Sequence, residues 1–183
     1  GDVYKRQHYL RGGGREGANP HPLFHSDFYR GQQAPGSEHA AAALVHYLAE
    51  GEGLGLAPNP LFDPVFYSKT NPDLAGIDSL LGHYACFGAG EGRAPNPLFA
   101  PGFYAAQVRG RSVARGELLA HYLEIGEAEG LPPHPLFDPV HYGAQGEGIA
   151  SNSGSHLGDF LRHGGEPGTA PPRLFGSAGY AEQ

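Results

Sequence analysis

A motif of 37 or 38 residues recurs along almost the whole chain, and this recurrence limits the possible folds more than any other feature. The copies align on one position, which is occupied by His8, His46, His83, His121 and Asp159. By subtraction, successive members of this series are 38, 37, 38 and 38 residues apart. Glycine follows five and nine residues later in every copy. Each copy also has a Leu-Phe pair and, five residues after the phenylalanine, one of the tyrosines Tyr29, Tyr67, Tyr104, Tyr142 and Tyr180. A period of this length is typical of solenoids, in which each repeat buries its apolar face against its neighbours.

The best-formed copy predicts a first short helix. Asp63 followed by Pro64 is a helix-start pattern. The carboxylate can accept from the free backbone N–H groups of the first turn, and proline at the first position has no N–H that would be left unpaired. Phe62 and Tyr67 then stand at the two positions that close a hydrophobic staple. The helix should end near Asn71, because the proline after it disfavours the helical conformation.

The same copy predicts a second helix, which we expect to begin at Asp78. Gly88 should then end this helix in the left-handed conformation. One apolar helical face is predicted for Leu80, Leu81, Tyr84 and Phe87.

We therefore predict an all-α fold of short helix pairs, stacked as a small solenoid with Gly/Pro-rich loops. The first seven residues resemble a translated sequencing-library transposon end and are set aside as a processing scar, and the natural protein is expected to be longer. The expected divisions are 1–7 (scar), 8–19 (truncated half-repeat), 20–57, 58–94, 95–132, 133–170 (degenerate in its second half) and 171–183 (truncated repeat).

The other copies depart from this pattern in ways that give further expectations. The first has His25 at the cap position, although Ser26 or Asp27 could serve, and its second helix is expected over 38–50. The third has Ala100 in place of the capping aspartate. Its second apolar face should contain Leu118, Leu119, Tyr122 and Ile125. In the fourth copy the Gly- and Ser-rich stretch 143–158 predicts a loose loop.

Composition excludes several classes of function. A formal net charge of −7 argues against nucleic-acid binding, which requires clustered Lys and Arg. No apolar run approaches the roughly 20 residues of a membrane-spanning helix. One cysteine cannot form an internal disulfide, and it leaves the cellular compartment open.

The recurring histidines invite a metal-site interpretation, which we do not favour. His46, His83 and His121 occupy equivalent positions, and packed helices lie about 8–10 Å apart, too far for shared coordination at about 2 Å. The alternative is a structural histidine that bridges a helix and a loop. Local pairs, which are His21 with His25 and His134 with His141, lack supporting Cys or carboxylate ligands.

No other pattern indicates catalysis or a cofactor. The glycine-rich segments 51–55 and 88–92 follow a predicted helix, whereas phosphate-binding loops precede one. The carboxylates of Glu16, Glu91 and Glu129 are expected at a solvated edge, and Cys86 at a variable surface position. We therefore predict no catalytic, cofactor-binding or metal-binding residues in this chain.

The combined motif of His-Tyr-Leu, Gly, Pro-Leu-Phe-Asp-Pro and Phe-Tyr resembles tandem repeats that flank the catalytic domains of large bacterial glycosyltransferases of surface-polysaccharide synthesis. Similar units occur in secreted calcium-binding repeat proteins. The resemblance covers nearly all of the chain after Gln7 and implies a non-catalytic scaffold in the cytoplasm, where parts of the natural protein outside this chain could associate it with the membrane. Its partners would be other domains of the same polypeptide or other proteins. The alternative is an extracellular glycan-binding or adhesive module, in which exposed tyrosines could stack on sugars.

Overall fold

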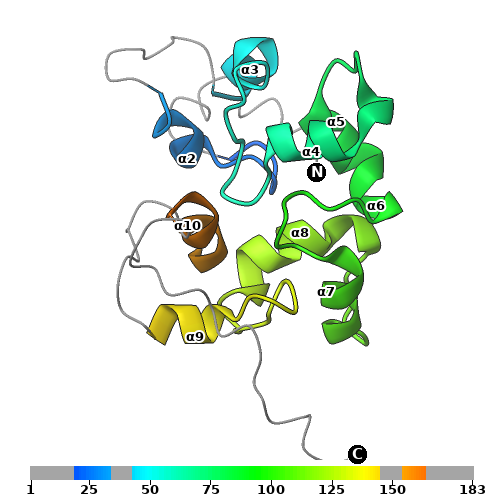
Figure 1. Ribbon diagram of the computed structural model, residues 1–183, viewed down its shortest axis with the longest axis vertical. Helices are drawn as coiled ribbons and strands as arrows, with labels where there is room; N and C mark the ends of the chain where they lie inside the picture. The colour runs from blue at the N-terminus through cyan, green and yellow to red at the C-terminus, as the bar shows by residue number, and fades with distance from the viewer. Residues whose placement is uncertain (1–18, 34–42, 145–153, 164–183) are drawn as a thin grey trace, which may run out of the picture.

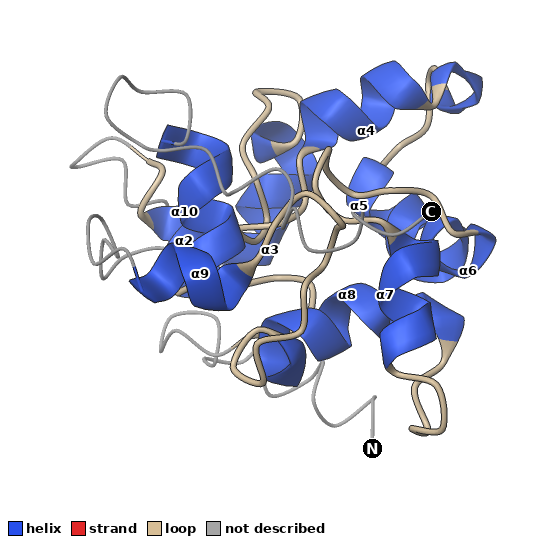
Figure 2. Ribbon diagram, turned by 60° about the horizontal axis from the view of Figure 1, so that its bottom comes forward, coloured by secondary structure: helices blue, strands red, loops and turns tan. Residues whose placement is uncertain are grey.

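The computed structural model describes residues 19–33, 43–144 and 154–163 (Figure 1). Over these ranges the chain forms helices and loops and no β-strand, so the all-α prediction is confirmed (Figure 2). None of the helices in these ranges is long and apolar enough to cross a membrane. Residues 8–18 of the half-repeat 8–19 and the whole of the truncated repeat 171–183 lie outside the described residues.

The first helix of each described copy has the predicted position. These helices are α2 (Ser26–Arg30), α4 (Pro64–Thr70), α7 (Pro101–Gln107) and α9 (Pro139–Ala144). Asp63 caps α4 by accepting the Phe66 amide at 2.9 Å, and α4 ends at Asn71, both as predicted. Asp138 caps α9 in the same manner. Ala100 precedes α7 without a side-chain cap.

The poor cap expected for α2 at His25 is confirmed, and the alternative caps Ser26 and Asp27 are wrong. His25 is the residue before the helix, and its side chain makes no capping hydrogen bond. Ser26 lies inside the helix, and its amide donates to the Asn19 side-chain oxygen at 2.8 Å. An upstream asparagine therefore satisfies one of the free amides at the helix start.

The second helix is a composite in three of the four described copies. A turn of α-helix that ends at the recurring histidine continues into a turn of π-helix that ends at glycine. The segments are α3 (Ala43–His46) with η2 (Tyr47–Gly51), α5 (Leu80–His83) with η4 (Tyr84–Gly88) and α6 (Ala89–Glu91), and α8 (Leu118–His121) with η6 (Tyr122–Gly126). Short 3₁₀ turns form η3 (Pro72–Leu74) and η5 (Arg115–Glu117). The fourth copy has the regular helix α10 (His156–His163).

Two predicted ends of the second helix are wrong. Ser79, not Asp78, is the residue before α5, and its hydroxyl accepts the Gly82 amide at 3.0 Å. Gly88 has right-handed angles, φ −58° and ψ −38°, and the chain turns instead at Gly92, with φ 80°. Gly92 thus ends the helix in the left-handed conformation, which glycine adopts without the backbone strain that a residue with a Cβ atom would have.

The predicted apolar faces are only partly correct. Leu81 and Tyr84 are buried as expected, whereas the side chain of Phe87 is 63% exposed. In the third copy Ile125 is likewise 45% exposed. A π-turn bonds residue i to i+5, so Gly88, one residue further on, takes the inward place that an α-helix would give to Phe87.

The expected loop of the fourth copy is also partly wrong, because α10 already begins at His156. Residues 145–153 of that expected loop lie outside the described ranges, as do residues 38–42 of the helix expected over 38–50. The part of that helix which is described starts at Ala43.

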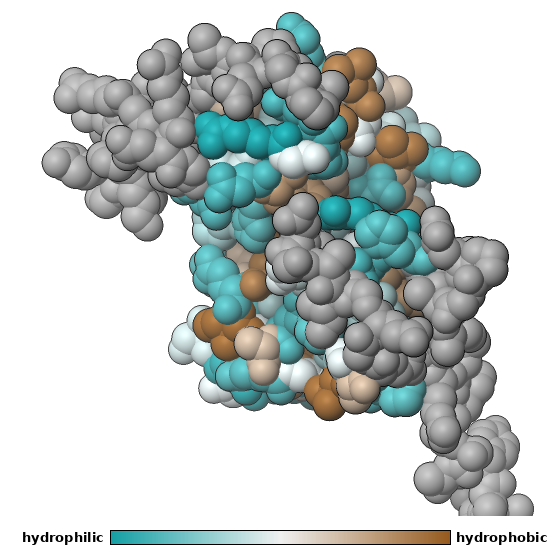
Figure 3. Space-filling model, turned by 90° about the vertical axis from the view of Figure 1, so that its left-hand side faces the viewer, coloured by the Kyte–Doolittle hydropathy of each residue, from teal (hydrophilic) through white to brown (hydrophobic). Residues whose placement is uncertain are grey.

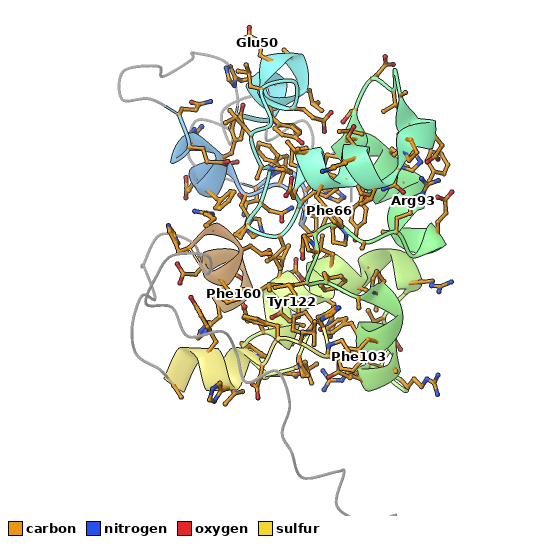
Figure 4. The ribbon with its side chains drawn as sticks, viewed as in Figure 1. Glu50, Phe66, Arg93, Phe103, Tyr122 and Phe160 are labelled. Carbon is orange, nitrogen blue, oxygen red and sulfur yellow. The ribbon has the colours of Figure 1, made fainter. Side chains whose placement is uncertain are left out.

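Three aromatic rings form the core of each copy. In the second copy Phe62 lies 5.3 Å from Tyr67, which confirms the predicted staple, and Tyr84 meets Tyr67 edge-on at 5.5 Å. The other copies repeat this cluster, as Phe24, Tyr29 and Tyr47, as Phe99, Tyr104 and Tyr122, and as Phe137, Tyr142 and Phe160. Figure 4 shows Tyr122 and Phe160 directed into the interior.

Equivalent backbone hydrogen bonds join each described copy to the next. The backbone amides of His25, Asp63 and Ala100 donate to the carbonyl oxygens of Pro58, Pro95 and Pro133, respectively, at 2.9–3.1 Å. The helix pairs follow one another around the molecule, so that α10 comes to lie beside α2 (Figures 1 and 2). Arg162 of α10 stands over the Phe28 ring of α2, with 4.3 Å from the guanidinium carbon to the ring centroid. The first and fourth copies are thus in contact.

Candidate functional site

The recurring tyrosine and histidine of each copy meet inside the helix pair. The Tyr29, Tyr67 and Tyr104 hydroxyls lie 2.5, 3.0 and 2.7 Å from Nδ1 of His46, His83 and His121. In the fourth copy Tyr142 donates to Asp159 at 2.8 Å, so the aspartate replaces histidine as the polar partner. These histidines bridge two helices, whereas the expected bridge between a helix and a loop is present at His46, whose Nδ1 lies 3.1 Å from the Gln33 side chain in the loop after α2.

The first of the two recurring glycines makes room for this contact. A Cβ atom added at Gly88 would lie 2.0 Å from the Tyr67 hydroxyl oxygen. At Gly51 and Gly126 the corresponding distances to Tyr29 and Tyr104 are 2.1 and 1.9 Å. Since no real Cβ approaches another atom so closely, the glycine is required by packing and not by backbone conformation.

The buried tyrosines are unsuited to acid–base chemistry at neutral pH. Burial raises the pKa of Tyr29, Tyr67, Tyr104 and Tyr142, and for Tyr67 and Tyr142 the value is about 12. A general base works best with a pKa near the operating pH, and these phenols stay protonated there. The tyrosine–histidine pairs therefore serve as hydrogen bonds that satisfy buried polar groups.

A second repeated arrangement ties the loops of successive copies together. The Asn59 amide donates to the Leu23 carbonyl at 2.8 Å, and its oxygen accepts the Leu61 and Phe62 amides. Asn96 donates in the same way to Leu61 at 2.7 Å. His134 occupies this position in the fourth copy, where its Nδ1 accepts the Leu136 amide at 3.1 Å.

Sequence reasoning missed a third arrangement, in which a glutamate caps the helix of the following copy. Glu52 accepts from the amides of Leu80 and Leu81 at 2.9 and 2.8 Å and from the Tyr47 hydroxyl at 2.8 Å. Glu127 accepts from the Leu157 amide at 3.0 Å. Both residues directly follow the first recurring glycine, where the second copy has Ala89.

The remaining candidate residues do not converge on a reactive centre. Glu91 and Glu129 are exposed and pair with Arg93 and Arg111, and Cys86 is exposed. Glu16 lies outside the described residues. The two candidate histidine pairs have separate positions. His21 Nδ1 accepts the Leu23 amide, and His25 is the residue before α2. Similarly, His134 Nδ1 accepts the Leu136 amide, and His141 lies in α9. In the described part of the chain no group of three His, Cys, Asp or Glu side chains could hold a metal ion.

Two equivalent grooves lie at alternate junctions between copies. One, of about 490 Å³, is lined by Glu52–Gly55, α4 and Leu80. The other, of about 400 Å³, is lined by Glu127–Gly130, α9 and His156. At the junction between the second and third copies, Arg115 packs against Gly92 at the corresponding position.

Apolar side chains on the surface occur in small groups. Figure 3 shows them as separate brown areas among polar residues on the face that it presents. A third hollow, of about 340 Å³, lies between α7 and α9 and is lined by Phe103, Leu136 and Val140 among others.

Comparisons of this chain with protein-family models, with curated proteins and with solved structures gave no match.

Proposed function

We propose that this chain is a non-catalytic repeat scaffold, of the kind found in bacterial glycosyltransferase-type proteins of surface-polysaccharide synthesis. The observation that carries the proposal is the use of the recurring aromatic residues. Tyr29, Tyr67 and Tyr104 are fully buried, and each is hydrogen-bonded to a histidine of its own copy. Because the recurring polar and aromatic residues of the motif contact one another inside each copy, the motif supports a structural role.

The finer architecture belongs to the same proposal. Three equivalent backbone bonds between copies support a solenoid-like array with nearest-neighbour interfaces. The contact of Arg162 with Phe28 means that such an array would be strongly curved and not straight. The resemblance of the motif supplies the protein context, a cytoplasmic glycosyltransferase polypeptide whose other domains would be the partners.

The glycan-binding alternative requires aromatic rings that a sugar can reach. The tyrosine row does not meet this condition, because all four described members have 7% or less of their surface exposed. Among the described phenylalanines, Phe87 and Phe103 are the large exposed rings. They belong to different copies and different motif positions, and a repeated platform would use equivalent ones.

A stability and binding experiment separates the two functions. Tyr67→Ala removes a buried ring and should destabilise the protein by about 3–5 kcal/mol, whereas Glu91→Ala removes only a surface ion pair worth about 0–1 kcal/mol. The unchanged protein should bind no oligosaccharide and hydrolyse no nucleotide sugar. If Tyr67→Ala keeps its melting temperature but abolishes a measurable oligosaccharide affinity, the glycan-binding function is correct.

The protein context has its own test, which is the gene sequence on both sides of this chain. A nucleotide-sugar transferase domain in the same reading frame is the expected result. An array of calcium-binding repeats would instead favour the secreted adhesive module.

A further inference from the structure

Helix α10 covers an apolar face that the first two copies form together. Besides the contact of Arg162 with Phe28, Gly158 lies against Pro60, since a Cβ atom on this glycine would be 2.5 Å from the Pro60 Cβ. Leu61, the next residue, has no exposed surface. Glycine at the contact point and arginine one turn later are the features that fit α10 to this face.

An equivalent face exists between the third and fourth copies. Phe103, Pro135 and Leu136 each lie 75 residues after Phe28, Pro60 and Leu61, which is two repeat lengths by subtraction. Here the phenylalanine is 36% and the leucine 39% exposed, and a hollow of about 340 Å³ opens between them. Figure 4 shows Phe103 on α7, on the far side of the molecule from α10. No helix within the described residues covers this second face.

We propose that the face formed by Phe103, Pro135 and Leu136 is a docking surface for a helix of a further repeat of this type. That helix would carry glycine at the contact point and arginine four residues later, as α10 does. The proposal rests on the scaffold function and names its partner: another repeat, packed as the fourth copy packs on the first two.

The chemistry of the face agrees with a helix that presents an arginine at this point. The Phe103 ring would receive the guanidinium in the manner of the Phe28 ring, a contact favoured by the negative face of the aromatic ring. Asp138, at the rim of the hollow, is exposed and adds a negative charge. A second copy of this chain is the poorer occupant, because its own α10 is already packed and both molecules carry −7.

The face is small, so a separate helix should bind it weakly. A repeat in the same polypeptide would be present at an effective concentration of about millimolar, which compensates for low intrinsic affinity. The surface is therefore suited to contacts within a long repeat protein or between tethered domains.

The test uses the full 183-residue chain and a peptide with the sequence of 154–163, GSHLGDFLRH. A side-chain crosslink between positions 156 and 160 would hold the peptide helical, and it lies on the opposite side from Gly158 and Arg162. Amide chemical shifts of the labelled protein are followed during titration. We expect saturable shifts around Phe103 and Leu136.

Matched variants make the result specific. Peptides with Gly158→Leu or Arg162→Glu should bind about tenfold more weakly or worse. The protein variant Leu136→Asp, at an exposed position, should lose binding while its circular dichroism spectrum stays unchanged. Absence of saturable shifts, equal binding by the Arg162→Glu peptide, or shifts confined to Phe28 and Leu61 would overturn the proposal. None of these outcomes bears on the scaffold function, whose test is the stability of Tyr67→Ala and the lack of oligosaccharide binding.

Discussion

Alanine at Gly88 should destabilise the protein although it replaces glycine inside a helix. Alanine normally gains about 0.5–1 kcal/mol over glycine in a helix, and the right-handed angles of Gly88 permit it. The added methyl group, however, would lie 2.0 Å from the Tyr67 hydroxyl oxygen, which is held by His83. Overpacking of this kind costs about 1–3 kcal/mol, and the severity of the contact favours the upper end. The expected net loss is about 2 kcal/mol.

The structure offers a control two residues away. Gly90 lies in α6, and a Cβ atom there would meet nothing within 4 Å. Gly90→Ala should therefore be neutral or should stabilise by about 0.5–1 kcal/mol. The difference between the two variants measures the contact with Tyr67, because both share the same change in backbone entropy.

Urea unfolding followed by far-ultraviolet circular dichroism measures both free energies. The loss in Gly88→Ala corresponds to a melting temperature lower by about 4–8 °C for a chain of this size. Removing the hydroxyl with Tyr67→Phe leaves the nearest ring carbon 3.2 Å from the new methyl group. In this background Gly88→Ala should cost at least about 1 kcal/mol less than it does alone. Equal stability of Gly88→Ala and Gly90→Ala would refute the packing explanation.

Two further variants test other repeated contacts. His134→Asn should stabilise by about 0.5–1.5 kcal/mol in urea unfolding, because an amide can also donate to the Leu98 carbonyl as Asn59 and Asn96 donate to theirs; an unchanged or lower stability would contradict this. Burial lowers the pKa of His134 below its usual 6.5, so the unfolded chain binds more protons and stability falls as the pH drops through that value. His134→Asn should then lose less stability than the parent between about pH 7 and about pH 5, and an identical pH profile would count against this role. Glu52→Ala removes the hydrogen bonds from Tyr47, Leu80 and Leu81 and should cost about 1–2 kcal/mol in melting experiments, whereas a loss as small as that of Glu91→Ala would exclude the capping role.

Local patterns in the sequence predicted local structure well. The Asp63 cap, the end of α4 at Asn71 and the pairing of Phe62 with Tyr67 depend on residues a few positions apart. Their geometry follows from the start of a helix alone. The expected burial of Phe87 is wrong because it depends on the α-helical period, and the π-turn at Tyr84–Gly88 changes that period.

Contacts between elements were not predicted, although one of them left a signal. Tyr67 and His83 recur together with Gly88, and this joint recurrence could have indicated a three-residue contact. The cap by Glu52 acts on amides 28 and 29 residues away, beyond the local motifs by which caps are recognised. No pattern in the repeat indicates how sharply the copies turn, because that angle depends on the shape of the packed interfaces.

The contact between α10 and α2 changes how the described part of the chain should respond to thermal fluctuation. In an open row of repeats the terminal units have one neighbour each, and they fray before the middle melts. Contact between the first and fourth copies gives each of them a second neighbour, which corresponds to periodic boundary conditions in a one-dimensional cooperative chain. Partial unfolding from either end then breaks two interfaces instead of one. The four copies should consequently unfold as a single cooperative unit, and the aromatic clusters of the outer copies should be protected almost as well as those of the inner ones.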